Sequence, residues 1–282
     1  MKTVIIIPAH NEEAFIGHCI ESFISQSRRP DLLLIVDDNS TDHTSKVVER
    51  FLPDNPWIKL IHHISDASHQ PGAKVVNAFN FGLAHLDQNY DLTGKFDADI
   101  VLPENYFSET IEEFEGFSTL GLCSGLLYIK NETGWVYENI SDKSHVRGPV
   151  KLYRTECLQK MGGLRASIGW DTVDELLANY HGFESKTLKA LKVKHLRPTG
   201  AAYDRNKARL RGEALYRMRY GTVLSLIATV KMAWNNGGLA YFVQCMKGYI
   251  HARKSGTKPI VSPEEGKFIR NYRWKNIRKK LF

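Results

Sequence analysis

Residues 32–51 read LLLIVDDNSTDHTSKVVERF. The apolar run 32–36 predicts a buried strand, and residues 39–42 (NSTD) supply turn and helix-capping side chains before apolar residues recur at helical spacing up to Phe51. A strand that passes through a turn into a helix is half of a βαβ unit. The acidic pair Asp37-Asp38 falls where the predicted strand ends.

The same pattern surrounds this stretch. An Asn11 cap is expected to start a helix in which Phe15, Cys19 and Phe23 recur every fourth residue. Strands that alternate with helices predict a mostly parallel α/β sheet, in which ligands bind at the carboxyl ends of the strands. The further strands are expected at residues 3–8, 57–61, 92–96, 120–129, 150–153 and 193–196, and the further helices at residues 73–86, 171–180 and beyond Arg205.

Charge divides the chain of 282 residues unevenly. Residues 1–204 carry 20 basic and 28 acidic residues, a net charge of −8, whereas residues 205–282 carry 18 basic and 3 acidic residues, a net charge of +15. The overall charge of +7 therefore comes from the last quarter of the chain. We expect a catalytic or ligand-binding body over residues 1–204, followed by a basic helical extension over residues 205–282.

Composition excludes several classes of protein. Hydrophobic residues make up 43% of the chain, too many for a disordered protein. The four cysteines are far apart and form no CxxC pair, which argues against a zinc or disulfide framework and favours a reducing compartment. The apolar run 4–7 is too short for a secretory signal, and the best candidate span, 223–234, is interrupted by Lys231. We therefore expect a cytoplasmic protein without a transmembrane helix.

Asp97-Ala98-Asp99 directly follows the strand predicted at 92–96. Two carboxylates two residues apart on an extended chain point the same way, so both can reach one divalent cation, or a cation and a sugar hydroxyl. Mg²⁺ or Mn²⁺ held there would stabilise a diphosphate as a leaving group. A solvated turn is the alternative for an isolated motif of this kind. The second acidic pair at the same sheet edge favours the functional interpretation.

That second pair, Asp37-Asp38, exceeds what a helix cap needs, so one carboxylate is free to accept hydrogen bonds from a nucleobase or ribose. The loop Ile7-Pro8-Ala9-His10-Asn11-Glu12 would line the same crevice, and Lys74, at a helix start, could meet a phosphate. Ordinary turn, cap and solvated-lysine roles are the alternatives.

The chain resembles the family 2 inverting glycosyltransferases of the GT-A fold, in which a Rossmann-like sheet is flanked by helices. The resemblance covers roughly residues 3–200, and it depends on an ordered set of motifs. These are VIIIPAHNEE (4–13), VDDNSTD (36–42), Lys74 with NFGL (80–83), FDAD (96–99), RGP (147–149), GGL (162–164) and GWDTVDE (169–175), with Gly182 closing the last helix.

This resemblance implies that residues 1–204 are a catalytic domain, with a nucleotide-sugar half to about residue 100 and an acceptor half over about 101–204. It also implies a nucleotide-diphosphate sugar donor and residues that bind it. Pro8, His10, Glu12 and Asp38 would lie around the base and ribose, and Lys74 near phosphate. Asp97 would lie near the ribose or the metal, and Asp99 would bind the metal, Mg²⁺ or Mn²⁺.

The resemblance also implies a catalytic base at the start of the helix predicted over 171–180. Asp171 would take the proton of an acceptor hydroxyl, with Asp174, one turn later, as the rival base. Trp170 stands where the family usually has Glu, and with Arg147 and Asp174 it is a candidate for acceptor contacts. Asn39 replaces a more usual Gly, which Asn tolerates in a left-handed turn. His195, after the last predicted strand, is a candidate metal or diphosphate ligand, with a structural role as the alternative.

The basic extension interleaves aromatic and cationic residues, most densely over 268–282. Such a segment suits a helix at the surface of an anionic membrane, and a helix packed on the rest of the chain is the alternative. The sequence carries no recognised nucleic-acid motif. We therefore expect a metal-dependent inverting glycosyltransferase at the inner face of the cell membrane, acting on a glycan or polyprenyl-linked acceptor. The rivals are a sugar nucleotidyltransferase, whose glycine-rich phosphate loop is missing from the sequence, and a non-catalytic nucleotide- or glycan-binding relative.

Overall fold

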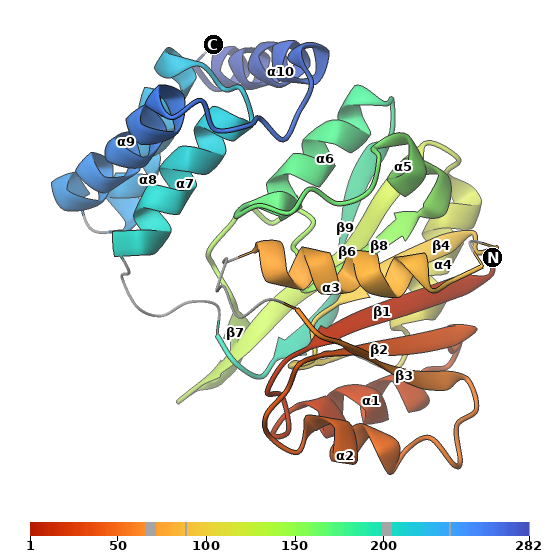
Figure 1. Ribbon diagram of the computed structural model, residues 1–282. Coiled ribbons are helices and arrows are strands. Elements are labelled where there is room, and N and C mark those ends of the chain that lie inside the picture. Colours follow the sequence, from red (N-terminus) through yellow and green to blue (C-terminus); the bar gives the residue numbers. More distant parts are fainter. Residues whose placement is uncertain (66–71, 88, 199–204, 237, 282) are drawn as a thin grey trace. The chain divides into compact units, whose positions relative to one another are not determined.

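A computed structural model describes residues 1–282 except 66–71, 88, 199–204, 237 and 282 (Figure 1). The described residues form two compact units. Unit 1 comprises residues 1–69, 74–164 and 181–199, and unit 2 comprises 70–73, 165–180 and 200–282. Unit 2 thus includes the helix at 170–180 as well as the C-terminal helices. The predicted domain boundary after Asp204 lies outside the described residues and stays a prediction.

Unit 1 is built on one mixed sheet with the strand order β3-β2-β1-β4-β8-β6-β9-β5, and β7 pairs with β6. Its strands are β1 (Thr3–Ala9), β2 (Leu32–Asp38), β3 (Ile58–His63), β4 (Leu92–Phe96), β5 (Ile100–Val101), β6 (Leu120–Asn131), β7 (Gly134–Tyr137), β8 (Val150–Arg154) and β9 (Glu184–His195). Its helices are α1 (Ile16–Ile24), α2 (Thr44–Glu49), α3 (Ala73–Ala84), α4 (Tyr106–Gly116) and α5 (Thr155–Lys160).

The first four strands form the parallel half that the sequence predicts. β1 lies between β2 and β4 and pairs with both in parallel, so the order of the strands reverses at β1. A crevice opens at the carboxyl ends of the strands at such a switch point. The segments that carry His10, Asp38 and Asp97 leave the sheet at this edge.

Helices cover both faces of this half, which explains why its strands are continuously apolar. Ile5 and Ile7 pack in one core cluster with residues of α1, α2 and α4. On the other face, α3 approaches so closely that a Cβ on Gly82 would come within 2.8 Å of Val36 and 2.9 Å of Ile6. Figure 1 shows α3 on the opposite side of these strands from α1 and α2.

Three local predictions were wrong. Asn11 does not cap α1, whose N-cap is Phe15 without a side-chain hydrogen bond. Instead Asn11 adopts a left-handed backbone (φ 55°), and its side-chain oxygen accepts from the Thr41 amide at 2.8 Å, which ties the first two loops together. The polar stretch between β6 and β8 contains the strand β7, and β9 starts nine residues before the predicted Val193. The left-handed conformation expected at Asn39 is confirmed (φ 60°).

Unit 2 is helical, with α6 (Trp170–Tyr180), α7 (Arg205–Arg217), α8 (Thr222–Asn236), α9 (Gly238–Lys254) and α10 (Pro263–Leu281). The backbones of α7 and α9 meet at two glycines. A Cβ on Gly212 would lie 1.8 Å from the carbonyl oxygen of Cys245, and one on Gly248 would lie 2.0 Å from that of Arg209. In the described part of the chain, no helix has the length and apolar content needed to cross a bilayer.

Candidate active site

The carboxylates of Asp37 and Asp38, at the end of β2, have different surroundings. Asp37 serves the turn, because it accepts from the Ser40 amide at 3.1 Å and from the Ser45 hydroxyl. Asp38 is 3% exposed and lies 2.9 Å from His63 Nδ1 and 3.9 Å from Lys74 Nζ. Asp38 is therefore the carboxylate that the turn does not need, as the sequence predicts for one member of the pair.

The loop after β1 lies against this site. His10 Nδ1 is 2.7 Å from the backbone oxygen of Asp38, so the imidazole is held at the end of β2. Pro8 is the last but one residue of β1 and pairs with Val36. Unit 1 thus brings together His10, Asp38 and Lys74, three of the residues predicted around the donor.

Asp97 is held by a lysine inside the sheet. Lys95, on β4, is only 2% exposed, and its ammonium group forms an ion pair with the Asp97 carboxylate and donates to the Gly148 oxygen at 3.4 Å. Side chains two residues apart on a strand point the same way, which brings these two charges together. The Asp97 side chain is 30% exposed, so part of it remains accessible at the sheet edge.

Asp99 belongs to a row of buried charges. Its Oδ1 lies 3.6 Å from His195 Nε2, and His195 Nδ1 lies 3.1 Å from Glu138 Oε2, which also accepts from Arg147. Burial opposes protonation of His195, but its hydrogen bonds with Asp99 and Glu138 raise its pKa to about 9. Burial would raise the pKa of Asp99, but its hydrogen bond with His195 and the charge of Arg197 lower it. At neutral pH the row alternates in sign.

Arg197 connects two of the predicted donor-site carboxylates. It lies 3.1 Å from Asp99 Oδ2, forms an ion pair with Glu12, and places its guanidinium 5.5 Å from the centre of the Phe15 ring. Burial raises the pKa of Glu12, more than the hydrogen bond with Arg197 lowers it. Arg197 therefore neutralises this part of the sheet edge from within the chain.

The carboxylates at this sheet edge are possible ligands for a divalent cation. No group of three or more His, Cys, Asp or Glu side chains within the described ranges is arranged to hold a metal ion. Mg²⁺, however, is commonly held by one or two carboxylates together with substrate phosphates, and Asp97 and Asp99 supply hard oxygen donors at one edge. The residues therefore fit a cation that shares its coordination with a bound diphosphate.

The predicted base lies in unit 2. Asp171 is in the first turn of α6 and is partly exposed, whereas Asp174 is 2% exposed and its Oδ1 accepts from the Glu175 amide at 2.6 Å. Trp170 is 7% exposed, and Arg147, in unit 1, is 6% exposed and paired with Glu138. The acceptor contacts expected of Trp170, Arg147 and Asp174 stay predictions.

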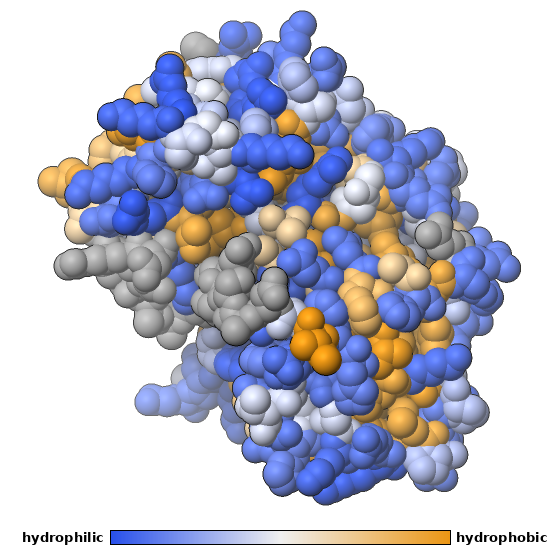
Figure 2. Space-filling view, in the orientation of Figure 1, coloured by the Kyte–Doolittle hydropathy of each residue, from blue (hydrophilic) through white to orange (hydrophobic). Residues whose placement is uncertain are grey.

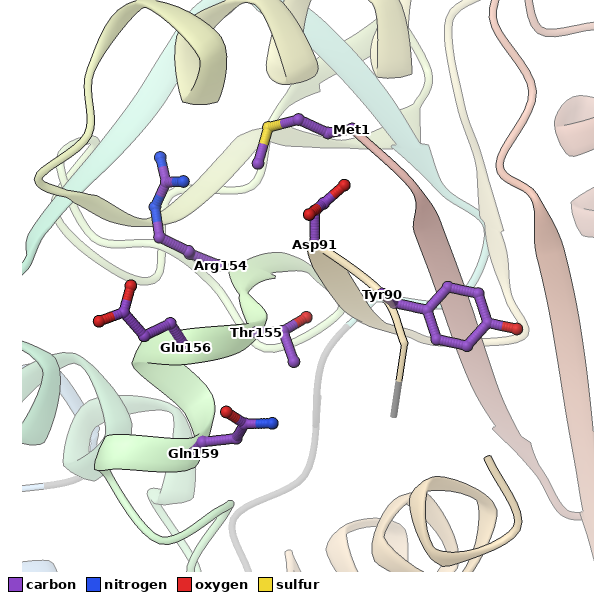
Figure 3. Close-up of a pocket in the computed structure, with 7 residues that line it drawn as sticks. All are labelled: Met1, Tyr90, Asp91, Arg154, Thr155, Glu156 and Gln159. Atoms are coloured by element: carbon purple, nitrogen blue, oxygen red, sulfur yellow. The ribbon is translucent and has the colours of Figure 1, made fainter. Parts of the chain in front are cut away.

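A pocket of about 290 Å³ lies elsewhere on unit 1 (Figure 3). Its lining includes Met1, Asp91 and Arg154, which lie before β1, before β4 and at the end of β8. Because β8 is antiparallel to β4, these positions mark the amino ends of the parallel strands. The pocket is therefore at the sheet edge opposite the acidic residues, and it is not the candidate active site.

The conserved-family profile described as Glycosyl transferase family 2 matches residues 4–166, more than half of the chain. The chain belongs to this family. The match includes the segments that carry His10, Asp38, Asp97 and Asp99.

Curated relatives in the family match only part of the chain. The beta-monoglucosyldiacylglycerol synthase of Synechocystis sp. is 32% identical over 133 residues, which are 46% of this chain and 26% of that protein. The probable glycosyltransferase YdaM of Bacillus subtilis is 31% identical over 100 residues, 35% of this chain and 23% of that protein. The matched region thus spans about a quarter of the length of these two relatives.

Solved structures match over nearly the whole chain. Staphylococcus aureus TarS 1–349, in complex with UDP-GlcNAc, superposes with a TM-score of 0.57 at 18% identity, covering 90% of this chain and 73% of that one. The mannosyltransferase PcManGT of Pyrobaculum calidifontis, in complex with GDP-Man and Mn²⁺, gives a TM-score of 0.61 at 15% identity, covering 92% and 77%. These likenesses confirm the predicted GT-A fold.

Three charged residues at this edge of unit 1 are not predicted from the sequence. Lys95 could have been found, because it precedes Asp97 by two residues on a strand and must share its side. Arg197 follows the singled-out His195 by two residues, but no local pattern indicates that it reaches Glu12. Glu138 carries no local signal, because its partners His195 and Arg147 lie 57 and 9 residues away.

Proposed function

We propose that this glycosyltransferase moves a sugar from a nucleotide-diphosphate donor to a hydroxyl of a glycan or polyprenyl-linked acceptor, with inversion and with the help of Mg²⁺ or Mn²⁺. One observation carries the proposal. His10, Asp38, Asp97 and Asp99 leave three neighbouring strands at the switch point of the sheet, where α/β proteins bind nucleotides. The UDP-GlcNAc and GDP-Man complexes of the two structural neighbours support a nucleotide-sugar donor.

The donor would be held by residues of unit 1. Asp38, with the Pro8, His10 and Glu12 segment, would bind the base and ribose, and Lys74 would stay near phosphate. Lys95 fixes the rotamer of Asp97, and His195 does the same for Asp99, so that the two carboxylates are held in place before the donor arrives. A bound divalent cation would neutralise charge that develops on the departing diphosphate.

Asp171 would complete the reaction as a general base. As the acceptor oxygen forms its bond to the anomeric carbon, the carbon–oxygen bond to the diphosphate breaks and the hydroxyl proton moves to the Asp171 carboxylate. One displacement from the opposite face inverts the anomeric configuration. The N-terminal position of Asp171 on α6 favours its ionised form, and its partial exposure leaves it more accessible than Asp174.

The proposal places the protein at the inner face of the cell membrane, in the synthesis of a polysaccharide or a lipid-linked glycan. Lipid-linked acceptors are presented at a membrane surface, and the basic C-terminal helices would bring the catalyst there. A cytoplasmic location gives access to nucleotide sugars.

A panel of nucleotide sugars tests the function. Full-length protein with Mn²⁺ is incubated with each nucleotide sugar, and the release of nucleoside diphosphate is measured. Slow hydrolysis of one donor, abolished in Asp99→Asn, is expected. Formation of pyrophosphate from a sugar phosphate and a nucleoside triphosphate would identify a nucleotidyltransferase. Donor binding without turnover, with every acceptor class supplied, would identify a non-catalytic relative.

A further inference from the structure

Helix α8 exposes several large apolar side chains. Its exposed side carries Val223, Leu226, Ile227, Val230 and Trp234, and the Trp234 side chain is 89% exposed. At 3.6 residues per turn these five positions fall within an arc of about 100°. They therefore form one continuous apolar stripe on the outside of unit 2.

The inner side of the same helix is partly polar. Ser225 and Thr229 are 0% exposed, and neither hydroxyl has a hydrogen-bond partner among the described residues. A helix that is exposed to water normally has its apolar side turned inward. In α8 five large apolar side chains are exposed, whereas two hydroxyls without described partners are buried. This arrangement favours a non-aqueous surrounding for the outer side of the helix.

Helix α9 carries an apolar stripe of its own. Leu239 (78% exposed), Val243 and Ile250 recur on one side of that helix, and α8 packs against α9. We call these eight exposed residues of the two helices the α8–α9 face. Figure 2 shows apolar side chains at the left-hand edge of the surface, where Figure 1 places α8 and α9.

The charged residues of α8 and α9 are all basic. Lys231, Lys247 and Lys254 are exposed on the same two helices, and the sequence has no Asp or Glu from residue 214 to residue 263. An apolar stripe bordered by lysines matches an anionic lipid surface, in which acyl chains meet the stripe and head groups meet the ammonium groups. Trp234 is of the residue type that prefers the interface between water and lipid.

Helix α10 exposes no large apolar side chain over 263–279, the part of it whose side chains the structure describes, although its sequence is rich in aromatic residues and cations. Ile269 is 0% exposed, and the Phe268 ring lies 5.4 Å from that of Tyr180, on α6. Arg270 donates to the Arg219 oxygen at 2.7 Å, and Arg273 to the Tyr220 hydroxyl at 2.9 Å. These contacts make α10 a packed part of unit 2.

We propose that the α8–α9 face binds the surface of an anionic bilayer, with both helices lying in the plane of the interface and their apolar side chains among the upper acyl chains. The inference refines the membrane contact in the proposed function, by assigning it to these two helices in place of α10. Neither helix meets the length and hydropathy needed to span the bilayer, as expected for interfacial helices.

Vesicle sedimentation of the full chain tests the assignment. Wild-type protein should sediment with phosphatidylcholine vesicles that contain about a third phosphatidylglycerol, and Ile227→Gln/Trp234→Gln should weaken binding about tenfold or more. Both replaced side chains are exposed, so the melting temperature should not change. The control Ile64→Gln/Phe117→Gln removes similar exposed apolar surface from unit 1 and should bind like wild type.

A second measurement distinguishes insertion from electrostatic attraction alone. Brominated lipids should quench Trp fluorescence in the wild type, and Trp234→Phe, which keeps binding, should lose most of that quenching. Lys231→Gln/Lys247→Gln should weaken binding to anionic vesicles, whereas Lys59→Gln/Lys189→Gln should not.

Three results would overturn the inference. The first is equal vesicle binding by wild type and Ile227→Gln/Trp234→Gln, and the second is loss of binding when α10 is removed and the α8–α9 face is intact. The third is a wild-type protein that does not bind vesicles but forms a dimer in sedimentation velocity, while the double variant is monomeric. The last result would assign the face to a second copy of the chain. Donor hydrolysis measured without vesicles should be the same in the double variant and the wild type. If vesicle binding fails, the proposed sugar transfer is therefore not affected. If donor hydrolysis fails, the vesicle measurement can still be interpreted.

Discussion

The acidic sheet edge of unit 1 and helix α8 of unit 2 both bury polar side chains, but they do so in opposite ways. At the sheet edge, Asp99, His195, Glu138 and Arg147 follow one another as alternating charges within hydrogen-bond or ion-pair distance. In α8 the hydroxyls of Ser225 and Thr229 are buried without a partner among the described residues. A buried polar group with partners fixes geometry, whereas one without partners costs stability. At the sheet edge buried polar groups therefore hold one another in place, whereas in α8 they do not.

The largest effect is expected in unit 2, at Asp171. Asp171→Asn removes the proton acceptor while keeping the size of the side chain, so kcat for sugar transfer should fall about 10²- to 10⁴-fold. Calorimetric affinity for the nucleoside diphosphate with Mn²⁺ should not change, because the proposed donor-binding residues lie in unit 1. The matched variant Asp174→Asn should keep most activity. If Asp174→Asn loses transfer and Asp171→Asn does not, the base role passes to Asp174.

At the sheet edge, Asp99→Asn should weaken Mn²⁺-dependent binding of a nucleoside diphosphate by about 100-fold, because an amide is a far weaker ligand for a hard cation than a carboxylate. Isothermal titration with and without Mn²⁺ measures the difference. Asp54→Asn, at an exposed position in the turn before β3, serves as the control. Unchanged affinity in Asp99→Asn would remove the metal assignment.

The row of paired charges predicts a large stability effect. Glu138→Gln leaves His195 and Arg147 without their shared anion, so the free energy of unfolding of unit 1 should fall by about 3 kcal/mol. Urea unfolding measures this, with Glu132→Gln, exposed in the turn between β6 and β7, as the control. A loss below about 0.5 kcal/mol, the range of an ordinary surface substitution, would show that the row does not stabilise the fold.

Arg197 predicts a change in the opposite direction. Because its guanidinium lies against Asp99 Oδ2 at 3.1 Å, a divalent cation must displace it, and Arg197→Gln should bind Mn²⁺ about tenfold more tightly without nucleotide. Electron paramagnetic resonance of free Mn²⁺ gives the affinity. Arg29→Gln removes a cation that stacks on Trp57 instead, and should leave Mn²⁺ binding unchanged. Weaker Mn²⁺ binding in Arg197→Gln would contradict the competition.

The smallest effect is expected for the buried hydroxyl of Thr229, in α8. Thr229→Val removes a buried hydroxyl without a described partner, and should raise the free energy of unfolding by about 1 kcal/mol. The matched variant Thr110→Val removes a hydroxyl that is equally buried but donates to the Tyr106 oxygen at 2.8 Å, and should lower it by about 1 kcal/mol. The same sign in both variants would break the contrast between the two regions.

The sequence predicts the parallel half of unit 1 well because its signals are local. Strand β4 has the predicted bounds, 92–96, since an apolar run between turn residues needs no distant partner to be recognised. The first half of β9 could not be predicted in this way. Its residues are mostly polar and partly exposed, and they are extended because β6, more than fifty residues earlier in the chain, lies beside them. Strand β7 is only four residues long and pairs with β6 across a tight turn, so it is short enough to be lost in the polar residues that follow it.

Some residues of the candidate site also have a local sequence signal, and others do not. Asp38, Asp97 and Asp99 were predictable because they end predicted strands, and Asp38 proves to be the carboxylate free of the turn. Arg197 contacts Asp99, and Glu138 contacts His195, only after the sheet has formed. The membrane contact was expected most strongly in α10 from its aromatic and basic residues, but composition does not say which side of a helix packs inward. The fully buried Ile269 decides that for α10.

The two glycines between α7 and α9 have a consequence for how unit 2 moves. Because Gly212 and Gly248 bring the two backbones into direct contact, neither helix can tilt or slide without opening the other. Amide hydrogens of α7 and α9 should then exchange with solvent through one shared opening, at one common free energy. Hydrogen exchange would show these two distant segments of the sequence losing protection together. The two helices would then move as one rigid pair, against which α8 packs.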